Sequence, residues 1–368
     1  MLEVAIVGCG KIADAHAAQI GRIAGCEIVG VCDREPLMAR QLAERFPVHR
    51  CYADLAELLD RARPDVVHVT TPPASHFEIA RACLEAGCHV YVEKPLALDA
   101  GQTRALLALA SENGRTLTVG HDDQFSHAAR RLRALVRDGA LGGPVVHMES
   151  VYGYDLAESG YARALLADKT HWVRRLPGGL LQNVISHGIA RIAEFLTGDA
   201  PAVIVHGFTS PRLRALGEAA IVDEVRVILG EDDGPTAYFT FSSTMRPSLH
   251  ELRLYGPRGG LLLDQDRETV TRLPGTRRTS YLEMFVSPLD VARQQVGNVL
   301  TNARTFLGRD FHMKAGMKTL IEAFYRSIVD GAPPPIPYRE ILLTARIMDV
   351  VFDQLRARRP AEVIDDRR

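Results

Sequence analysis

The sequence predicts two consecutive domains: an α/β domain with a parallel, doubly wound sheet, then an α+β domain with an open, mostly antiparallel sheet. Three observations support this prediction. The 368 residues suffice for two or three domains of ordinary size. Up to about residue 120, short β-branched runs alternate with helical patterns. Beyond that point, long alternating segments follow one another with few helices between them. We therefore expect one domain over residues 1–121 and another over residues 122–368.

The predicted strands of the first domain are near-continuous apolar runs, which is typical of a sheet covered on both faces. They span residues 4–7, 28–32, 66–70, 89–93 and 117–120, with a weak candidate at 48–50. The predicted helices span residues 12–23, 36–46, 55–62, 75–86 and 100–113. Because strands and helices alternate, we expect the strands to run parallel.

The second domain begins with predicted helices and one strand, and then becomes rich in strands. The helical patterns span residues 125–137 and 180–196, with a strand over residues 145–152 between them. Turn signals such as Gly-Pro and Asp-Asp-Gly separate five further strands, predicted over residues 202–209, 222–229, 236–243, 250–255 and 260–264. Three helices close the chain, over residues 288–306, 312–330 and 339–358.

Composition and charge narrow the class of protein. Lys and Arg number 44 against 45 Asp and Glu, so no overall field attracts a nucleic acid or an anionic membrane. No apolar run approaches the ~18 residues that span a bilayer. The six cysteines form no C-x-x-C pair, so we expect buried thiols in a reducing compartment and a cytoplasmic protein.

The sharpest motif lies between the first strand and the first helix, where the chain reads Gly8-Cys9-Gly10-Lys11-Ile12-Ala13. Gly8 permits a tight turn, Gly10 lets the backbone approach a pyrophosphate, and Ala13 allows helix and strand to pack closely. Asp33 ends the second strand 20 residues after Ala13, where a carboxylate accepts hydrogen bonds from ribose hydroxyls. This context predicts a dinucleotide-binding Rossmann domain with NAD as cofactor. Arg34 keeps NADP open, because a guanidinium can pair with a 2′-phosphate.

Two further segments lie at the carboxyl ends of predicted strands, the edge at which open α/β sheets bind ligands. They are Thr70-Thr71-Pro72-Pro73 with His76, and Glu93-Lys94-Pro95. With these motifs in this order, and with Gly178-Gly179 and His187 further on, the chain resembles the Gfo/Idh/MocA oxidoreductases. That family includes glucose-fructose oxidoreductase and inositol dehydrogenase. The resemblance covers nearly the whole chain.

The resemblance implies a nicotinamide-dependent enzyme. It would transfer a hydride between the cofactor and a carbinol or keto carbon of a sugar, nucleotide-sugar or cyclitol. In the family, the lysine of the Glu-Lys-Pro motif reaches the substrate hydroxyl, which implies Lys94 as the proton-transfer residue. A neighbouring nicotinamide cation disfavours the ammonium form, so we expect a lowered pKa for Lys94.

Family members also carry a helical aspartate followed four residues later by a histidine. Here these positions hold Asn183 and His187, which the i, i+4 spacing places on one helical face. His187 can accept a proton or bind a hydroxyl. Asn183 cannot accept a proton and is left as a hydrogen-bonding group for the substrate. The expected catalytic residues are therefore Lys94, His187 and Asn183.

The expected binding residues fall into two sets. We expect the cofactor to contact Gly8, Gly10, Lys11, Ile12, Asp33, Arg34, Thr70, Thr71, Pro72, His76, Glu93 and Lys94. We expect the substrate to contact Lys94, Asp122, Gln124, Trp172, Arg174, Asn183 and His187.

Two of the substrate segments leave alternatives open. Gln124 and Asp122 stand where the family often has an arginine and an asparagine, which argues against a strongly anionic contact. His121, Asp122, Asp123 and His127 also have the chemistry of metal ligands, but we expect solvated cap residues there and no metal. Trp172 is suited to stack on a sugar face or the nicotinamide, or simply to pack in the core.

Two other functions stay open from the sequence. One is a reductase of a non-sugar carbonyl or imine, and the other is a non-catalytic nucleotide-binding protein, which the replacement by Asn183 keeps in play. We expect a small-molecule substrate and no nucleic-acid or membrane partner. Because open antiparallel sheets commonly bury one face against a partner, we also expect a homodimer or homotetramer through the second sheet.

Overall fold

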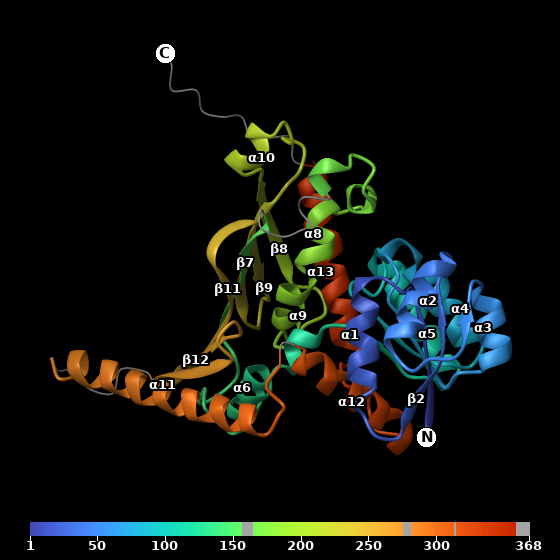
Figure 1. Ribbon diagram of the computed structural model, residues 1–368. Helices are drawn as coiled ribbons and strands as arrows, with labels where there is room; N and C mark the ends of the chain where they lie inside the picture. The colour runs from blue at the N-terminus through green and yellow to red at the C-terminus, as the bar shows by residue number, and fades with distance from the viewer. Residues whose placement is uncertain (157–164, 275–280, 313, 358–368) are drawn as a thin grey trace, which may run out of the picture.

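Two sheets organise the molecule (Figure 1), a computed structural model that describes residues 1–156, 165–274, 281–312 and 314–357. The first sheet has six strands in the order β3-β2-β1-β4-β5-β6. The second has seven strands in the order β13-β12-β11-β7-β10-β9-β8. This arrangement confirms the predicted fold class: a doubly wound α/β domain followed by an α+β domain.

All strands of the first sheet run parallel, as the alternation of strand and helix predicts. They are β1 (Leu2–Val7), β2 (Cys26–Cys32), β3 (Cys51–Tyr52), β4 (Val66–Val69), β5 (His89–Val92) and β6 (Leu117–Val119). The helices between them are α1 (Lys11–Ile20), α2 (Pro36–Arg45), α3 (Leu55–Ala62), α4 (His76–Glu85) and α5 (Ala100–Glu112). The weak strand predicted at residues 48–50 is displaced, because pairing with Val31 and Cys32 begins only at Cys51.

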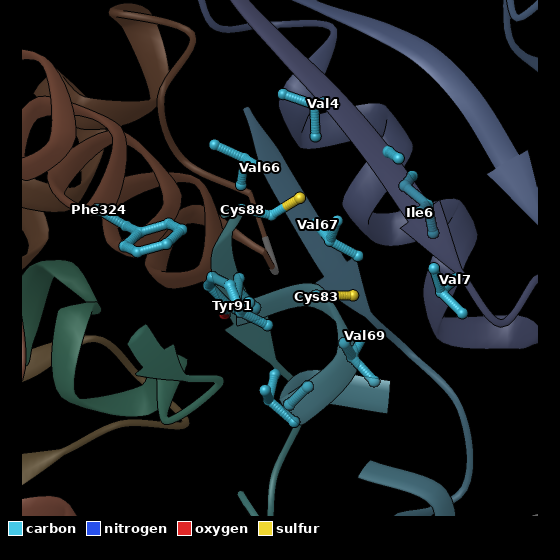
Figure 2. Close-up of a cluster of buried hydrophobic side chains, with 14 of the residues drawn as sticks. Val4, Ile6, Val7, Val66, Val67, Val69, Cys83, Cys88, Tyr91 and Phe324 are labelled. Atoms are coloured by element: carbon cyan, nitrogen blue, oxygen red, sulfur yellow. The ribbon is translucent and has the colours of Figure 1, made fainter. Parts of the chain in front are cut away.

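The first core contains side chains from both ends of the chain. Apolar residues of β1 from Val4 on, and those of β4 and β5, are buried. Figure 2 shows several of them with Phe324, which reaches in from α12 (Ala315–Asp330). The rings of Tyr91 and Phe324 meet edge to face, with centroids 6.1 Å apart. A helix that follows the second sheet in sequence therefore completes the core of the first. The predicted division at residue 121 stays a prediction.

The second sheet is mixed and mostly antiparallel. Its strands are β7 (His147–Asp155), β8 (Ala202–Phe208), β9 (Glu224–Gly230), β10 (Thr236–Ser242), β11 (Thr244–Gly256), β12 (Gly259–Asp264) and β13 (Thr269–Pro274). Within the described part of this second sheet, β7 and β10 pair in parallel and the other neighbouring strands pair antiparallel. The sequence did not predict β13 and placed the start of β11 too late, because Pro247 and a register shift interrupt the alternation there.

Helices cover one face of the second sheet and connect it to the first. They are α6 (His127–Arg137), α8 (Gly179–Val184), α9 (Ser186–Ala193) and α13 (Tyr338–Ala357), and α13 also contacts α5 (Figure 1). The helix predicted over residues 180–196 is thus two helices. Arg358, the last residue of the predicted final helix, lies outside the described residues.

Two further helices lie at the periphery of the second domain. The short α10 (Pro211–Ala215) was not predicted. The long α11 (Glu283–Leu307) extends away from the body of the molecule and includes Pro288, where the sequence had placed its start (Figure 1). Single 3-10 turns are η1 (Pro73–Ser75), η2 (Asp122–Phe125) and η4 (Trp172–Arg175).

The cysteines and the helices bear on two further predictions. All six cysteines are free, but Cys26 is only half-buried and Cys51 is exposed, so the prediction of buried thiols was wrong for these two. Within the described ranges, no helix combines the length and apolar character that crossing a membrane requires.

Candidate active site

The glycine turn after β1 is shaped by the segment that follows β4. Gly8 has φ +93°, and a Cβ there would lie 2.6 Å from Cγ2 of Thr71. Thr70 donates its hydroxyl to the carbonyl oxygen of Gly8 at 2.5 Å. In contrast, a Cβ on Gly10 would meet nothing within 4 Å. The turn is therefore closed toward Thr71 and open at Gly10, where a ligand can approach the backbone and the N-terminus of α1.

Asp33 lies at the end of β2 beside this turn. Its Oδ2 accepts from the backbone N–H of Cys9 at 2.7 Å, and its Oδ1 accepts from that of Glu35 at 2.9 Å. The carboxylate is thereby held next to the glycine turn, as a ribose-binding acid requires. Three further predicted cofactor residues are neighbours of this turn in the sequence: Lys11 and Ile12 follow Gly10, and Arg34 follows Asp33. Lys11 and Arg34 are exposed.

Buried groups connect the two loops at the carboxyl edge of the sheet. His76 is fully buried, and its two ring nitrogens lie 2.8 Å from the carbonyl oxygens of Thr71 and Pro95. Burial lowers the pKa of His76. Glu93 is also buried and accepts from Nε2 of His16 at 2.9 Å. His76 and Glu93 are therefore buried within the two loops and help to fix the loop conformation. Pro72 lies on the first of these loops.

Lys94 follows β5 and extends toward the second domain. The Lys94-Pro95 peptide is cis, and Nζ of Lys94 donates to the backbone carbonyl of Asn183, at the end of α8, at 2.8 Å. Desolvation lowers the pKa of Lys94, against the opposing charges of Glu93, Asp122 and Asp123. This direction agrees with the sequence prediction, although the physical cause here is burial.

Opposite Lys94, three ionisable side chains from two elements come together. Nδ1 of His187 on α9 lies 3.7 Å from Oδ2 of Asp123 and 4.0 Å from Oδ1 of Asp122, both on η2. One ligand-type atom from each of the three lies within 4.8 Å of the other two. The structure thus brings Lys94, His187, Asp122 and the backbone of Asn183 into one region. Asn183 lies on α8 and His187 on α9, so the prediction that one continuous helix carries both was wrong.

The two neighbouring carboxylates have different surroundings. Asp123 accepts from Nε2 of Gln265 at 2.6 Å, and Nη2 of Arg191 and the Tyr152 hydroxyl each lie 3.4 Å from its Oδ2. Asp122 accepts no hydrogen bond through its side chain from any residue that the structure describes. Asp123 is therefore the anchored carboxylate of the pair, and Asp122 is the unanchored one.

These surroundings separate the pKa values of the pair. Burial raises the pKa of Asp122, and the negative charges of Asp123 and Glu93 raise it further, against Lys314 and Lys94. Burial also opposes ionisation of Asp123, but His187, Arg191 and the hydrogen bond from Gln265 outweigh it and lower its pKa. Two like charges this close cannot both ionise freely, so the anchored carboxylate holds the charge.

Burial keeps the histidines of this region neutral at ordinary pH. The pKa of His187 falls to about 4, mainly through desolvation and despite the charge of Asp123. The pKa of His121 falls to about 3 through burial and the neighbouring His187 and Lys94. A neutral imidazole at position 187 can bind a hydroxyl or accept a proton.

A cavity of about 440 Å³ begins at the two carboxylates. Its walls come from η2, the start of α12, and strands β7 and β11 with the turn after β12. The polar residues among them are Asp122, Asp123, Ser126, His127, Tyr152, His250, Gln265, Asp266, Glu268 and His312. The sequence missed Tyr152, His250, Gln265 and Asp266, because no local motif marks residues that meet only across strands.

Three predicted substrate residues make their described contacts elsewhere. Gln124 donates to Oε2 of Glu194 at 3.0 Å. Arg174 binds Glu218 at 2.9 and 3.0 Å and lines a separate cavity of about 350 Å³ beside α8 and α13. The ring of Trp172 stacks on His171. None of the three has a described hydrogen bond or ring contact with Lys94 or His187 in the ranges covered by the structure, and their substrate role stays a prediction.

The three groups around His187 have a spacing that a metal ion accepts. However, Asp123 already binds the Arg191 guanidinium, and a second positive charge, Lys94, acts on the site. These cations disfavour a metal, and its absence remains a prediction.

Comparison with known proteins relates both halves of the chain to one family. Residues 2–121 match the family described as "Oxidoreductase family, NAD-binding Rossmann fold", and residues 129–262 match the "GFO/IDH/MocA C-terminal domain". The first match confirms the predicted Rossmann domain and its NAD cofactor. The residues fit the cofactor, because the backbone at Gly10 is open and Asp33 is held beside it.

Individual relatives agree with this assignment. The chain is 36% identical to the myo-inositol dehydrogenase Hyg17 of Streptomyces leeuwenhoekii, over 82% of this chain and 88% of that protein. It is 37% identical to a D-glucoside 3-dehydrogenase of Escherichia coli, over only 38% of this chain and 40% of that protein. The WlbA dehydrogenase of Bordetella pertussis, solved with NADH and UDP-GlcNAcA, has the same fold, with a TM-score of 0.76 at 16% identity over 97% and 96% of the two chains.

Proposed function

The chain belongs to the Gfo/Idh/MocA oxidoreductase family of NAD(P)-dependent dehydrogenases, and on this premise we propose which reaction it catalyses. It moves a hydride between nicotinamide and a carbinol or keto carbon of a cyclitol or sugar, with Lys94 as the proton-transfer residue. One observation carries the proposal: Nζ of Lys94 reaches the second domain at Asn183, in the region that holds His187 and Asp122. A base and hydroxyl-binding groups thus flank one point, as oxidation of an alcohol requires.

The chain's own residues bind and orient the reactants. The backbone at Gly8, Gly10 and the start of α1 receives the pyrophosphate, and Asp33 accepts from the ribose hydroxyls. NAD, when bound, supplies the hydride acceptor or donor. Asp33 favours NAD over NADP, because its carboxylate would repel a 2′-phosphate, whereas Arg34 is the residue that could accept one.

Proton transfer is the task of Lys94. Desolvation raises the share of the neutral amine, which can take the hydroxyl proton during oxidation. His187 is neutral at ordinary pH and orients the hydroxyl or assists the transfer. Reduction of the ketone uses the same groups in reverse, with the Lys94 ammonium as the acid.

The cavity next to the site favours an uncharged polyhydroxylated ring. Its described lining includes four carboxylates and three histidines, and neither Lys nor Arg. Such a surface offers acceptors for several hydroxyl groups and repels phosphates. A cyclitol or free sugar therefore fits better than a nucleotide-sugar. The similarity over most of the chain to a protein named as a myo-inositol dehydrogenase supports the same class.

The decisive test is NADH formation with a panel of inositols, sugars, glycosides and nucleotide-sugars, each with NAD and NADP. We expect turnover on an uncharged ring with NAD, and a loss of about 10²–10⁴-fold in Lys94→Ala. NAD binding, followed by fluorescence, should persist in this variant, because Lys94 lies at the end of the cofactor site. NAD binding without turnover on any panel member would favour a non-sugar carbonyl substrate or a non-catalytic protein.

We also propose that the open face of the second sheet pairs with another copy of the chain. Ile204, Ile228 and Tyr238 lie side by side on β8, β9 and β10 and are 43–50% exposed. Their sequence neighbours Leu229 and Ala237 face the opposite side and are buried, and Val203 is half-buried there. Light scattering should show a dimer or tetramer that Ile228→Glu disrupts, and a monomeric wild type would contradict this proposal.

A further inference from the structure

The long helix α11 turns a polar face toward its own chain. Gln294 bonds both backbone groups of Arg272 on the edge strand β13: its Oε1 accepts from the N–H at 2.7 Å, and its Nε2 donates to the carbonyl oxygen at 3.1 Å. One turn further, the buried Asn298 donates from Nδ2 to the carbonyl oxygen of Val270 at 3.1 Å. Hydrogen bonds of amide side chains therefore hold this face of α11 against the edge of the sheet.

The opposite face of α11 carries an apolar stripe. Its side chains recur at alternating intervals of four and three residues, which is the seven-residue repeat of a helix that packs along another helix. They are Phe285, Leu289, Ala292, Val296, Val299, Ala303 and Phe306. The five larger members are 61–69% exposed, and the stripe is about 32 Å long at 1.5 Å per residue. Monomeric proteins rarely leave more than a few hundred Å² of contiguous apolar surface exposed, so the stripe indicates a partner.

The position of α11 leaves room for a large partner. Helices α8, α9 and α13 lie on one side of the second sheet, together with the first domain (Figure 1). In the same view, α11 extends in the opposite direction, away from the body of the molecule. The stripe is therefore accessible along its whole length.

We propose that this stripe packs against the α11 stripe of a second copy of the chain, with the two helices antiparallel. The seven-residue repeat indicates a helical partner, and no charged residue interrupts the stripe. A lipid surface fits less well, because helices that lie on membranes are rich in Lys and Arg on their polar face. In contrast, α11 carries two acidic and two basic residues: Glu283, Asp290, Arg293 and Arg304.

The sizes of the side chains determine the partner and the orientation. In a parallel pair, equal positions would meet, so that Ala303 would face Ala303 and leave a void, while Phe285 would face Phe285. In an antiparallel pair, Phe285 of one copy meets Ala303 of the other, and Val296 meets Ala292. Large residues then face small ones in successive layers. The stripe is thus complementary to itself, and a two-fold axis relates the two copies.

The masses of charge-bearing variants test this contact by light scattering. The α11 contact is separate from the sheet contact proposed above, and two different two-fold contacts per copy give a tetramer. Val296→Glu/Val299→Glu should reduce this tetramer to a dimer, because unpaired carboxylates cannot be buried between the helices. Adding Ile228→Glu should give a monomer. The matched control Val329→Glu changes an equally exposed valine on α12 and should keep the wild-type mass.

Other wild-type masses also distinguish the two contacts. A dimeric wild type that Val296→Glu/Val299→Glu converts to a monomer would support the α11 contact and overturn only the sheet contact. Thermal unfolding should show that the double variant is folded, because both valines are exposed in the single copy. These measurements need no substrate, so failure of the proposed reaction leaves them unaffected.

Cysteine cross-linking tests the antiparallel orientation. All variants carry Cys51→Ser, because Cys51 is exposed, and this background is the control. Positions 285 and 303 lie about 27 Å apart along one helix, too far for a bridge within one copy. On oxidation, Phe285→Cys/Ala303→Cys should form a covalent dimer that a reducing agent dissolves. Neither single variant should do so, because each cysteine then faces an unchanged residue.

Three results would overturn the proposal. One is a mass of Val296→Glu/Val299→Glu that equals the wild-type mass. Another is a covalent dimer formed by Phe285→Cys alone, which would show a parallel pair. The third is a monomeric wild type that floats with phosphatidylglycerol vesicles, because the stripe would then bind lipid.

Discussion

Two buried polar groups in this molecule are built from the same residue types and differ in how completely they are paired. The first runs through the Rossmann domain as a chain of Glu93, His16, His68 and Tyr325. The second, between the domains, consists of His121, Asp122, Asp123 and His187. The comparison distinguishes buried polar groups that stabilise the fold through hydrogen bonds from buried polar groups whose hydrogen-bonding atoms remain available to a ligand.

In the first group, hydrogen bonds join every member to the next. His16 lies 2.9 Å from Glu93 and 2.8 Å from His68, and His68 lies 2.9 Å from the Tyr325 hydroxyl. One assignment of protons satisfies all three bonds: each member donates toward Glu93, from the Tyr325 hydroxyl to the carboxylate. These hydrogen bonds link α1, β4, the end of β5 and α12. The buried hydrogen-bond network therefore stabilises the first domain.

In the second group, several buried polar atoms have no partner within the described residues. They are both ring nitrogens of His121 and Nδ1 of His187. A buried polar atom without a partner costs about 1–3 kcal/mol, so this arrangement is stable only because the rest of the fold holds it. Such groups are expected where a substrate supplies the missing hydrogen bonds.

The sharpest way to test the comparison is His187→Gln. We expect kcat/KM to fall about 10²–10³-fold, because a neutral proton acceptor and hydroxyl ligand is lost. The free energy of unfolding should change by less than about 1 kcal/mol, because Nδ1 has no hydrogen-bond partner among the residues that the structure describes. Steady-state kinetics and urea unfolding measure the two effects. A large loss of stability with normal activity would place His187 in the structural class.

Acid and alkali should act oppositely on the two groups. Burial opposes ionisation of Glu93, but the hydrogen bond and the charge of His16 outweigh it and lower the pKa of Glu93 to about 2, below the ordinary range of a glutamate. Its stabilising contribution, about 3 kcal/mol, is therefore present above pH ~4.5 and lost as pH falls through about 2. Asp122 has a raised pKa, so its contribution is lost as pH rises through the folded value.

Unfolding measured as a function of pH checks both signs. Glu93→Gln should flatten the loss of stability between pH ~5 and ~2. Asp122→Asn should gain stability relative to wild type as the pH increases above neutrality, while it loses activity. If both variants instead respond to pH in the same direction, the two groups do not differ as the structure indicates.

The smallest effect is expected for Tyr325→Phe. Removing the hydroxyl leaves Nε2 of His68 without its partner in a fully buried position, which should cost about 1–3 kcal/mol. Activity at 25 °C should stay within about twofold, because Tyr325 lies on α12 behind the sheet. Thermal and urea unfolding, with kinetics as the control, measure the difference. Unchanged stability would show that the hydrogen bonds from Tyr325 to Glu93 do not stabilise the domain.

The same contrast shows how far the sequence could be interpreted. The glycine turn, Asp33 and the Glu93-Lys94-Pro95 segment were placed correctly at the carboxyl edge of the first sheet, because each is a short motif attached to one strand. The contacts of Gln124 and Arg174 were not foreseen, because their partners Glu194 and Glu218 lie far away in the sequence.

By itself, the sequence determined the family, the order of the two domains, the glycine turn after β1 and the position of Lys94 after β5. These depend on local periodicity and on motifs of a few residues, where chain geometry leaves little freedom. Only the tertiary structure decided that Asp123 is anchored by Gln265, 142 residues away, and that Asp122 beside it is not. It also placed Tyr325 against His68, 257 residues earlier. Burial and pairing depend on which distant segments meet, and they set the protonation of each side chain.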